Sequence, residues 1–308
     1  MATSSKRIRR HLRYTIVYRF VQVLIFLSRI MPRIAWLKLC GLMGRIAYYF
    51  ASETRHLTRK HLTMAFGKEK SPDEIKALTK KVFEYLGKNG GDILRATKVE
   101  NLEQLEEFLV VSGYDNFIKA NKKGKGVIFL TLHMGAFDMQ VSTMALKGLN
   151  PNIIGTPLKD ERLNELLWDY RNKYGAVAIQ RGRETFRMIK VLKSGGSVAL
   201  LIDQDTKVKS RFVNFFGIPA ATPVGATVLA MKTGAAVVPT YVYLGKDWKQ
   251  HMEILPEIPL TITGDDEADM VANTQVLSNF IEDTIRKHPE QWVWMHERWK
   301  TKPGEEIS

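Results

Sequence analysis

A histidine and an aspartate follow an apolar segment near the middle of the chain. Residues 127–132 are mostly β-branched or otherwise apolar, as in a buried strand, and His133 comes directly after them. Asp138 follows five residues later, beyond a glycine at which the chain can turn. A histidine at a sheet edge is suited to act as a general base, and a carboxylate can fix the tautomer of its imidazole. The spacing fits a helix-capping aspartate beside an ordinary histidine equally well, so the pair alone leaves both interpretations open.

Charged pairs follow two further strand candidates. Arg181 and Arg183 come after one of them, and Asp203 and Asp205 come after the next. Because open parallel sheets bind ligands beyond the carboxyl ends of their strands, we expect both pairs to lie along one edge with His133. The alternative is that an arginine and an aspartate form a salt bridge with a purely structural role. An Asp-x-Asp pair can also hold a divalent ion, but no other metal or nucleotide motif accompanies it, so we expect no metal and no cofactor.

The elements that must position these residues change in character at about residue 124. Residues 34–100 have a helical pattern, and we expect a helix start at Ser71-Pro72 and an interruption or end of that helix at Gly90-Gly91. Beyond residue 124, strand and helix patterns alternate, which predicts an α/β fold with a mostly parallel central sheet flanked by helices. We expect strands at 127–132, 153–154, 176–179, 197–202 and 237–244, with 252–255 as a partner, and helices at 161–174, 184–192, 224–232 and 271–287.

Composition narrows the class of partner. The 308 residues carry a formal net charge of +14, which favours nucleic acid, an anionic lipid surface or a phosphorylated substrate. The single cysteine, Cys40, excludes an intrachain disulfide and makes a structural zinc site improbable.

The first fifty residues combine basic and apolar side chains. Basic residues flank an apolar stretch at 14–28, and Arg19 interrupts it. The stretch lacks a signal-peptide cleavage site and is short for a spanning helix, so we expect an amphipathic helix on an anionic membrane interface. The alternative is a helix that packs on its own domain. We therefore divide the chain into membrane-associating helices at 1–50 and a domain at 51–308.

Together these blocks resemble the lipid A biosynthesis (lauroyl/myristoyl) acyltransferases, within the lysophospholipid and glycerolipid acyltransferase superfamily. The resemblance covers most of the chain, and the order and spacing of the blocks are more specific than any single one. The blocks that carry it are Leu132-His133-Met134-Gly135-Ala136-Phe137-Asp138, Ala178-Ile179-Gln180-Arg181, Ile202-Asp203-Gln204-Asp205, Phe215-Phe216-Gly217-Ile218-Pro219, Val237-Val238-Pro239 and the tryptophan-rich stretch 289–300.

The resemblance implies acyl transfer from a thioester of acyl carrier protein or coenzyme A to a hydroxyl of a membrane glycolipid, most simply a lipid A precursor. His133 would be the general base and Asp138 would orient it. Arg181 and Arg183 would hold an acceptor phosphate, with Asp203 and Asp205 also in the substrate site. Family members often carry Glu where this chain has Asp138, which leaves the acceptor open.

The implied location is the cytoplasmic face of the inner membrane. A lysophospholipid or phosphatidylinositol-mannoside acyltransferase is the alternative of the same fold, and a basic nucleic-acid-binding protein is the remote one. Trp292, Trp294 and Trp299 could form an interfacial belt, a core edge or part of the acceptor groove.

Overall fold

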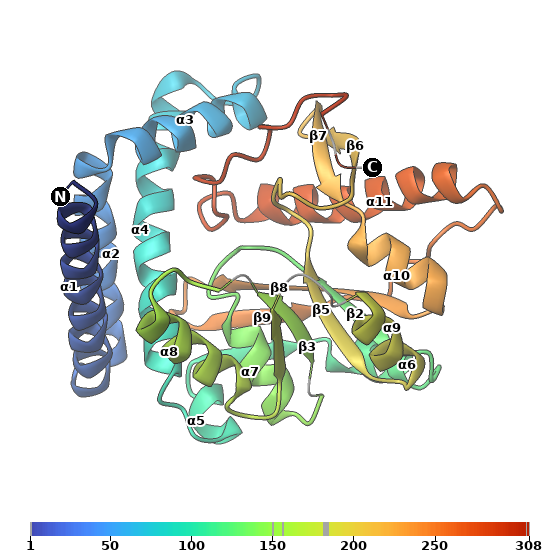
Figure 1. The fold of residues 1–308 in the computed structure, drawn as a ribbon, viewed down its shortest axis with the longest axis horizontal. Helices are drawn as coiled ribbons and strands as arrows, with labels where there is room; N and C mark the ends of the chain where they lie inside the picture. The colour runs from blue at the N-terminus through green and yellow to red at the C-terminus, as the bar shows by residue number, and fades with distance from the viewer. Residues whose placement is uncertain (1, 150, 156, 181–184, 306, 308) are drawn as a thin grey trace.

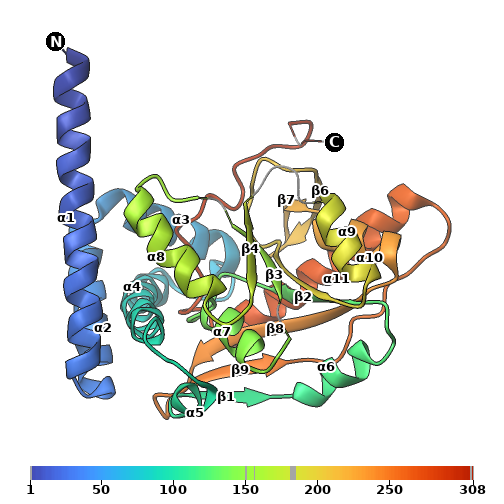
Figure 2. The same cartoon turned by 60° about the horizontal axis from the view of Figure 1, so that its bottom comes forward.

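A computed structural model describes residues 2–149, 151–155, 157–180, 185–305 and 307. Helices lie on both faces of a seven-stranded sheet whose strand order is β1-β9-β8-β2-β5-β3-β4 (Figures 1 and 2). The strands of this sheet are β1 (Leu109–Ser112), β2 (Val127–Thr131), β3 (Asn152–Gly155), β4 (Val177–Gln180), β5 (Ser197–Leu201), β8 (Ala236–Leu244) and β9 (Gln250–Ile254). A separate hairpin consists of β6 (Ser210–Phe215) and β7 (Ile218–Pro223). The predicted α/β fold is confirmed.

The helices fall into an N-terminal group and a group that alternates with the strands. The first group is α1 (Ala2–Ile30), α2 (Arg33–Phe50), α3 (Ser52–Phe66) and α4 (Pro72–Ala96). The second is α5 (Leu102–Glu106), α6 (Tyr114–Asn121), α7 (Met139–Leu146), α8 (Glu161–Asn172), α9 (Thr185–Lys193), α10 (Gly225–Thr233) and α11 (Asp266–Lys287).

Strand β2 lies in the middle of the sheet and delivers the candidate histidine. It pairs in parallel with β5 on one side and β8 on the other, so all five of its residues are buried. The predicted partner of β8 is confirmed as the antiparallel strand β9. Alternate residues of β2 face opposite layers of the core: Ile128 and Leu130 belong to a cluster shared with α9, α10 and α11, and Val127 and Phe129 to one shared with α6 and α7.

The N-terminal helices pack closely because glycines line the contact between α2 and α4. A Cβ atom added at Gly44 would lie 2.1 Å from the Phe83 carbonyl oxygen, and one at Gly87 would lie 2.1 Å from the Cys40 carbonyl oxygen. The same packing explains why the expected interruption at Gly90-Gly91 is wrong. Gly91 lies against Cys40, and α4 continues to Ala96. The predicted helix start is confirmed, with Ser71 and Glu74 forming a capping box.

Helix α1 stands at the edge of the molecule beside α2 (Figures 1 and 2). Its outer side exposes large apolar side chains, and α2 adds more. None of the helices that the structure describes has both the length and the apolar character required to cross a bilayer. The exposed side chains are Leu12, Ile16, Val17, Phe20, Val23, Phe26 and Ile30 on α1, and Ile34, Leu42, Ile46, Tyr49 and Phe50 on α2.

Candidate active site

A tight turn after β2 places His133 at the carboxyl edge of the sheet. Gly135 has a φ of 61°, in the left-handed region that favours glycine. A Cβ atom at this position would lie 2.1 Å from the Val242 carbonyl oxygen of β8, so backbone conformation and space both require glycine. The imidazole of His133 is partly open to solvent, with 25% of its side chain exposed, and the Phe137 ring packs edge-on against it at 5.0 Å.

The carboxylate that contacts His133 belongs to Asp203, which follows the adjacent strand β5. Its Oδ1 lies 2.8 Å from His133 Nδ1, and its Oδ2 accepts a hydrogen bond from the His133 backbone N–H at 2.8 Å. The indole Nε1 of Trp292 donates a third hydrogen bond to Oδ2, also at 2.8 Å. Because an ionised carboxylate can only accept, the hydrogen of the neutral imidazole sits on Nδ1. Nε2 is then the atom that can receive a proton.

The environment keeps Asp203 ionised although its side chain is fully buried. Burial by itself would raise the pKa of Asp203, but the electrostatic attraction of His133 and the hydrogen bonds from His133 and Trp292 outweigh burial. The pKa of Asp203 therefore lies below its ordinary value, and the carboxylate persists at neutral pH.

The expected bond between Asp138 and His133 is corrected by the structure. The Oδ1 of Asp138 lies 2.8 Å from Nε and 2.7 Å from Nη2 of Arg171, on helix α8. Asp138 immediately precedes α7 without capping it through its side chain, so the alternative role of helix cap is not observed either. Asp138 instead joins the turn that carries His133 to α8. Its importance for catalysis stays a prediction.

The other predicted site residues have different positions. Arg181 and Arg183 lie outside the described residues, so their assignment to an acceptor phosphate stays a prediction. Asp205 accepts hydrogen bonds from the backbone N–H and the hydroxyl of Thr301, at 2.7 and 2.9 Å. It thus fastens the C-terminal segment beside the site.

The C-terminal segment braces the turn from the far end of the chain. The backbone N–H of Gly135 donates to the Gln291 carbonyl, and that of Val293 donates to the His133 carbonyl, both at 3.1 Å. The tryptophans of this segment are buried, which places Trp292, Trp294 and Trp299 in the core.

Two more basic groups surround the carboxylates. Arg298 is fully buried and donates to Ala221 O and Thr222 Oγ1, and burial lowers its pKa to about 10. Burial also lowers the pKa of His296, whose Nδ1 is enclosed and has no hydrogen-bond partner in the described part of the chain. No three His, Cys, Asp or Glu side chains gather as a metal site in that same part.

A narrow crevice opens beside the Asp138–Arg171 pair, between β2, α7 and β3. Its volume is about 40 Å³, and its lining is largely apolar, including Val141, Met144 and Ile153. Thr131, Gln140 and Thr240 form a buried hydrogen-bonded chain at the same place. The site thus combines a base, an ion pair and an apolar recess at one sheet edge.

Comparison with known proteins identifies the family. The model of the bacterial lipid A biosynthesis acyltransferases matches residues 2–301. The chain belongs to this family. Family membership indicates an acyltransferase, and it agrees with the resemblance that the sequence blocks indicated.

The proteins to which the chain is similar differ in the acceptor that their names state. The lipid A biosynthesis lauroyltransferase of Escherichia coli K12 is 26% identical over 311 residues, covering 95% of this chain and 94% of the relative. The palmitoleoyltransferase of the same strain is 26% identical over 270 residues, covering 86% and 85%. A phosphatidylinositol mannoside acyltransferase of Mycobacterium tuberculosis H37Rv is 28% identical over 195 residues, covering 62% of this chain and 60% of that protein.

The residues that the sequence did not pair are Arg171 and Trp292. Arg171 falls within an expected helix, and its charge was the available signal. Its contact with Asp138 depends on the packing of α8 against the turn, which spacing along the chain does not encode.

Proposed function

We propose that the protein transfers a fatty acyl chain from an acyl thioester to a hydroxyl of a membrane glycolipid, specifically a lipid A precursor. The observation that carries this proposal is the pair of His133 and Asp203 at the carboxyl edge of the sheet, with the ring partly open to solvent. Family membership supplies the reaction class.

In this mechanism, Nε2 of His133 takes the proton of the acceptor hydroxyl as its oxygen attacks the thioester carbonyl. The tetrahedral intermediate collapses, the C–S bond breaks, and the imidazolium returns its proton to the departing thiolate. Asp203 holds the Nδ1–H and stabilises the imidazolium while the proton is on the ring. General base catalysis of this kind contributes about 10²–10⁴-fold to the rate.

Asp138 and Arg171 support the site in a different way. Because Arg171 is held through both Nε and Nη2, its guanidinium has a fixed orientation at the rim of the crevice. We assign to Asp138 the positioning of this cation and of α8. Arg181 and Arg183 retain their proposed contact with an acceptor phosphate.

Membrane attachment through residues 1–50 is part of the proposal. The exposed apolar side of α1 has exposed Arg13 and Arg19 beside it. This combination suits a helix lying in an anionic interface, with the arginines reaching the headgroups. We therefore place the protein on the cytoplasmic face of the inner membrane, with residues 51–308 as the acyltransferase domain. Acyl carrier protein and coenzyme A remain the two candidate donors, and we propose no nucleic-acid partner.

A phosphatidylinositol-mannoside type of acceptor is the second candidate. The similarity to the mycobacterial acyltransferase, 28% identical over 195 residues, favours it. The two candidates share the base and differ in the headgroup that the site must admit.

The deciding experiment is a lipid profile by mass spectrometry in the source organism after deletion of the gene. Complementation with the wild-type chain should restore one missing acyl group on lipid A, whereas His133→Ala should not restore it. Circular dichroism of purified His133→Ala checks that the fold is intact. Restoration by folded His133→Ala would eliminate the proposed base, and a loss confined to another glycolipid would eliminate lipid A as the acceptor.

A further inference from the structure

A second cavity lies away from His133, between α1 and α8. Its volume is about 440 Å³, within the range of sites that bind small molecules. It is bordered by the C-terminal half of α1, by Thr97 and Lys98 after α4, and by the last two turns of α8. Arg162 near the start of α8 contacts Thr15 and Tyr18, so α1 and α8 run side by side in the same direction.

The lining of this cavity combines basic and apolar side chains. Arg29, Lys98 and Lys173 are its cations, and Asp169 is its carboxylate. Desolvation lowers the pKa of Lys98, and the charges of Arg29 and Lys173 lower it further. The cations are therefore close enough to repel one another, and an anion between them would relieve the repulsion.

Of the three cations in the lining, only Lys173 has a hydrogen-bond partner in the described part of the chain: its Nζ donates to the Val99 carbonyl at 2.6 Å. Nearby, Arg95 donates to the carbonyls of Ser28 and Met31 at the end of α1. Arg95 thus already fills the usual role of a cation that binds the last carbonyls of a helix, here α1. In the described part of the chain, Arg29 and Lys98 form no side-chain hydrogen bond or ion pair.

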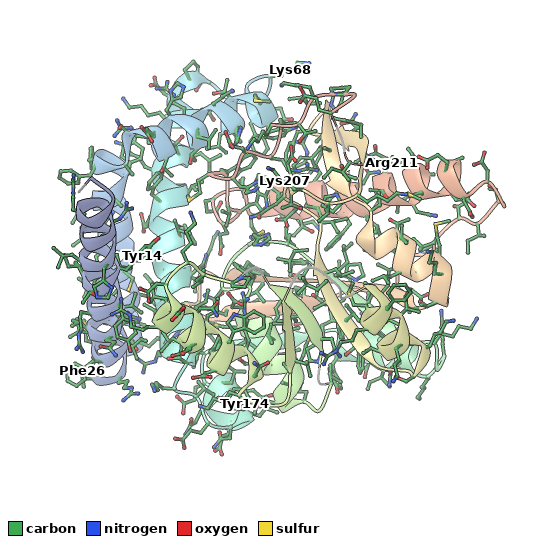
Figure 3. All side chains as sticks on the ribbon, viewed as in Figure 1. Tyr14, Phe26, Lys68, Tyr174, Lys207 and Arg211 are labelled. Atoms are coloured by element: carbon green, nitrogen blue, oxygen red, sulfur yellow. The ribbon has the colours of Figure 1, made fainter. Side chains whose placement is uncertain are left out.

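The apolar part of the lining includes a side chain from the exposed side of α1. Phe26 lines the cavity and is 59% exposed, and Ile25 and Leu166 form the adjacent wall. Figure 3 shows Phe26 at the outer edge of the molecule, near the lower end of α1. A ligand that fits this cavity has a negative head and an apolar tail.

We propose that the cavity between α1 and α8 binds the phosphate headgroup of an anionic membrane phospholipid, with Arg29 and Lys98 as its ligands and Phe26 against its acyl chains. Asp169 disfavours a more highly charged anion, so the site suits a phosphodiester with one negative charge. The same helix α8 carries Tyr170 into this cavity wall and Arg171 to Asp138, so bound lipid would also fix α8 beside the active site.

The inference rests on the proposed membrane attachment, and lysine footprinting separates the two. Full-length protein is treated with a water-soluble acylating reagent, and the modification of each lysine is followed by mass spectrometry. Three additions are compared: inorganic phosphate, phosphatidylcholine vesicles, and phosphatidylcholine vesicles containing phosphatidylglycerol. We expect the third addition to slow modification of Lys98 about fivefold or more beyond the second, while Lys76 on α4 is unaffected.

Matched variants test the ligands of the site. Arg29→Gln should remove the extra protection of Lys98, whereas Arg59→Gln removes the same charge from an exposed position on α3, outside the cavity, and should retain it. Equal protection of Lys98 by both kinds of vesicle would overturn the site. Absence of protection from vesicles that co-sediment with the protein would also overturn it. Neither result would contradict membrane attachment. Full protection by inorganic phosphate alone would overturn the assignment to a lipid. Failure to co-sediment with any vesicle would refute attachment and site together. None of these measurements depends on acyl transfer or on His133.

Discussion

Asp203 accepts three hydrogen bonds while it is fully enclosed, and this makes it the most constrained carboxylate of the site. A buried acceptor with this many donors holds its partner in one orientation, because any rotation would leave a polar group unsatisfied. Asp203 therefore directs the ring of His133, and Trp292 holds Asp203 in place, while Asp138 contacts Arg171.

Substitution of the two aspartates should distinguish these roles. Asp203→Asn removes the charge that stabilises the imidazolium, and we expect kcat to fall about 10²–10⁴-fold. Asp138→Asn keeps one acceptor for Arg171 and leaves the imidazole contact intact, so its kcat should fall much less. Steady-state kinetics on purified variants measures both values. A loss in Asp138→Asn as large as in Asp203→Asn would contradict this division of roles.

The sequence predicted His133 and Asp203 as site residues but joined His133 to the carboxylate that is nearer along the chain. The true partner depends on β2 and β5 being neighbours in the sheet, and strand order is a tertiary property. The placement of charged residues after strand ends was predictable, since parallel strands share one edge.

At the scale of the elements, His288 stands at the C-terminal end of α11 and has a strongly lowered pKa. The ring of His288 stacks on Tyr243 of β8, with centroids 4.0 Å apart. Burial, followed by the charges of Lys287 and His251, lowers the pKa of His288 to about 4. An unfolded chain binds this proton near pH 6.5, so the unfolded state takes up more protons between these values.

The free energy of unfolding should therefore decrease as the pH falls from about 6.5 to 4, in part because of His288. His288→Phe keeps the aromatic stack and does not titrate, so its stability should decline less over the same range. Thermal unfolding at pH 7 and at pH 4.5 measures the difference. Parallel pH profiles for the two proteins would rule out His288 as a contributor.

Other elements were beyond reach from sequence. The hairpin of β6 and β7 turns at Phe216, a non-glycine residue with a φ of 56°. We identified no turn motif there from the sequence. The long helices and the strands that alternate with them were predictable, because their apolar spacing is regular. We expected an interruption at Gly90-Gly91 because glycine has a low helix propensity. Helix α4 continues because Gly91 allows close contact with α2, and helix propensity does not include such tertiary packing.

On the scale of the molecule, the apolar surface is concentrated on one side. The helices α1 and α2 expose a row of large apolar side chains that the sheet does not cover. Large apolar side chains exposed in this number, with arginines beside them, support the membrane attachment that we propose.

The double variant Ile16→Ser and Phe20→Ser should weaken binding to anionic vesicles by about tenfold or more, because each side chain loses its transfer from water. Co-sedimentation with vesicles containing phosphatidylglycerol measures the change. Ile262→Ser is the control, since Ile262 is at least as exposed as Ile16 and Phe20 but lies between β9 and α11. Comparable weakening in the control would show that the effect is not specific to α1.

The brace that Gln291 and Val293 supply to Gly135 and His133 has a consequence for biosynthesis. Every strand of the sheet is translated before these two residues. The sheet can therefore begin to assemble while the turn that carries His133 still lacks these two hydrogen bonds. The candidate site is completed only after all seven strands have been made.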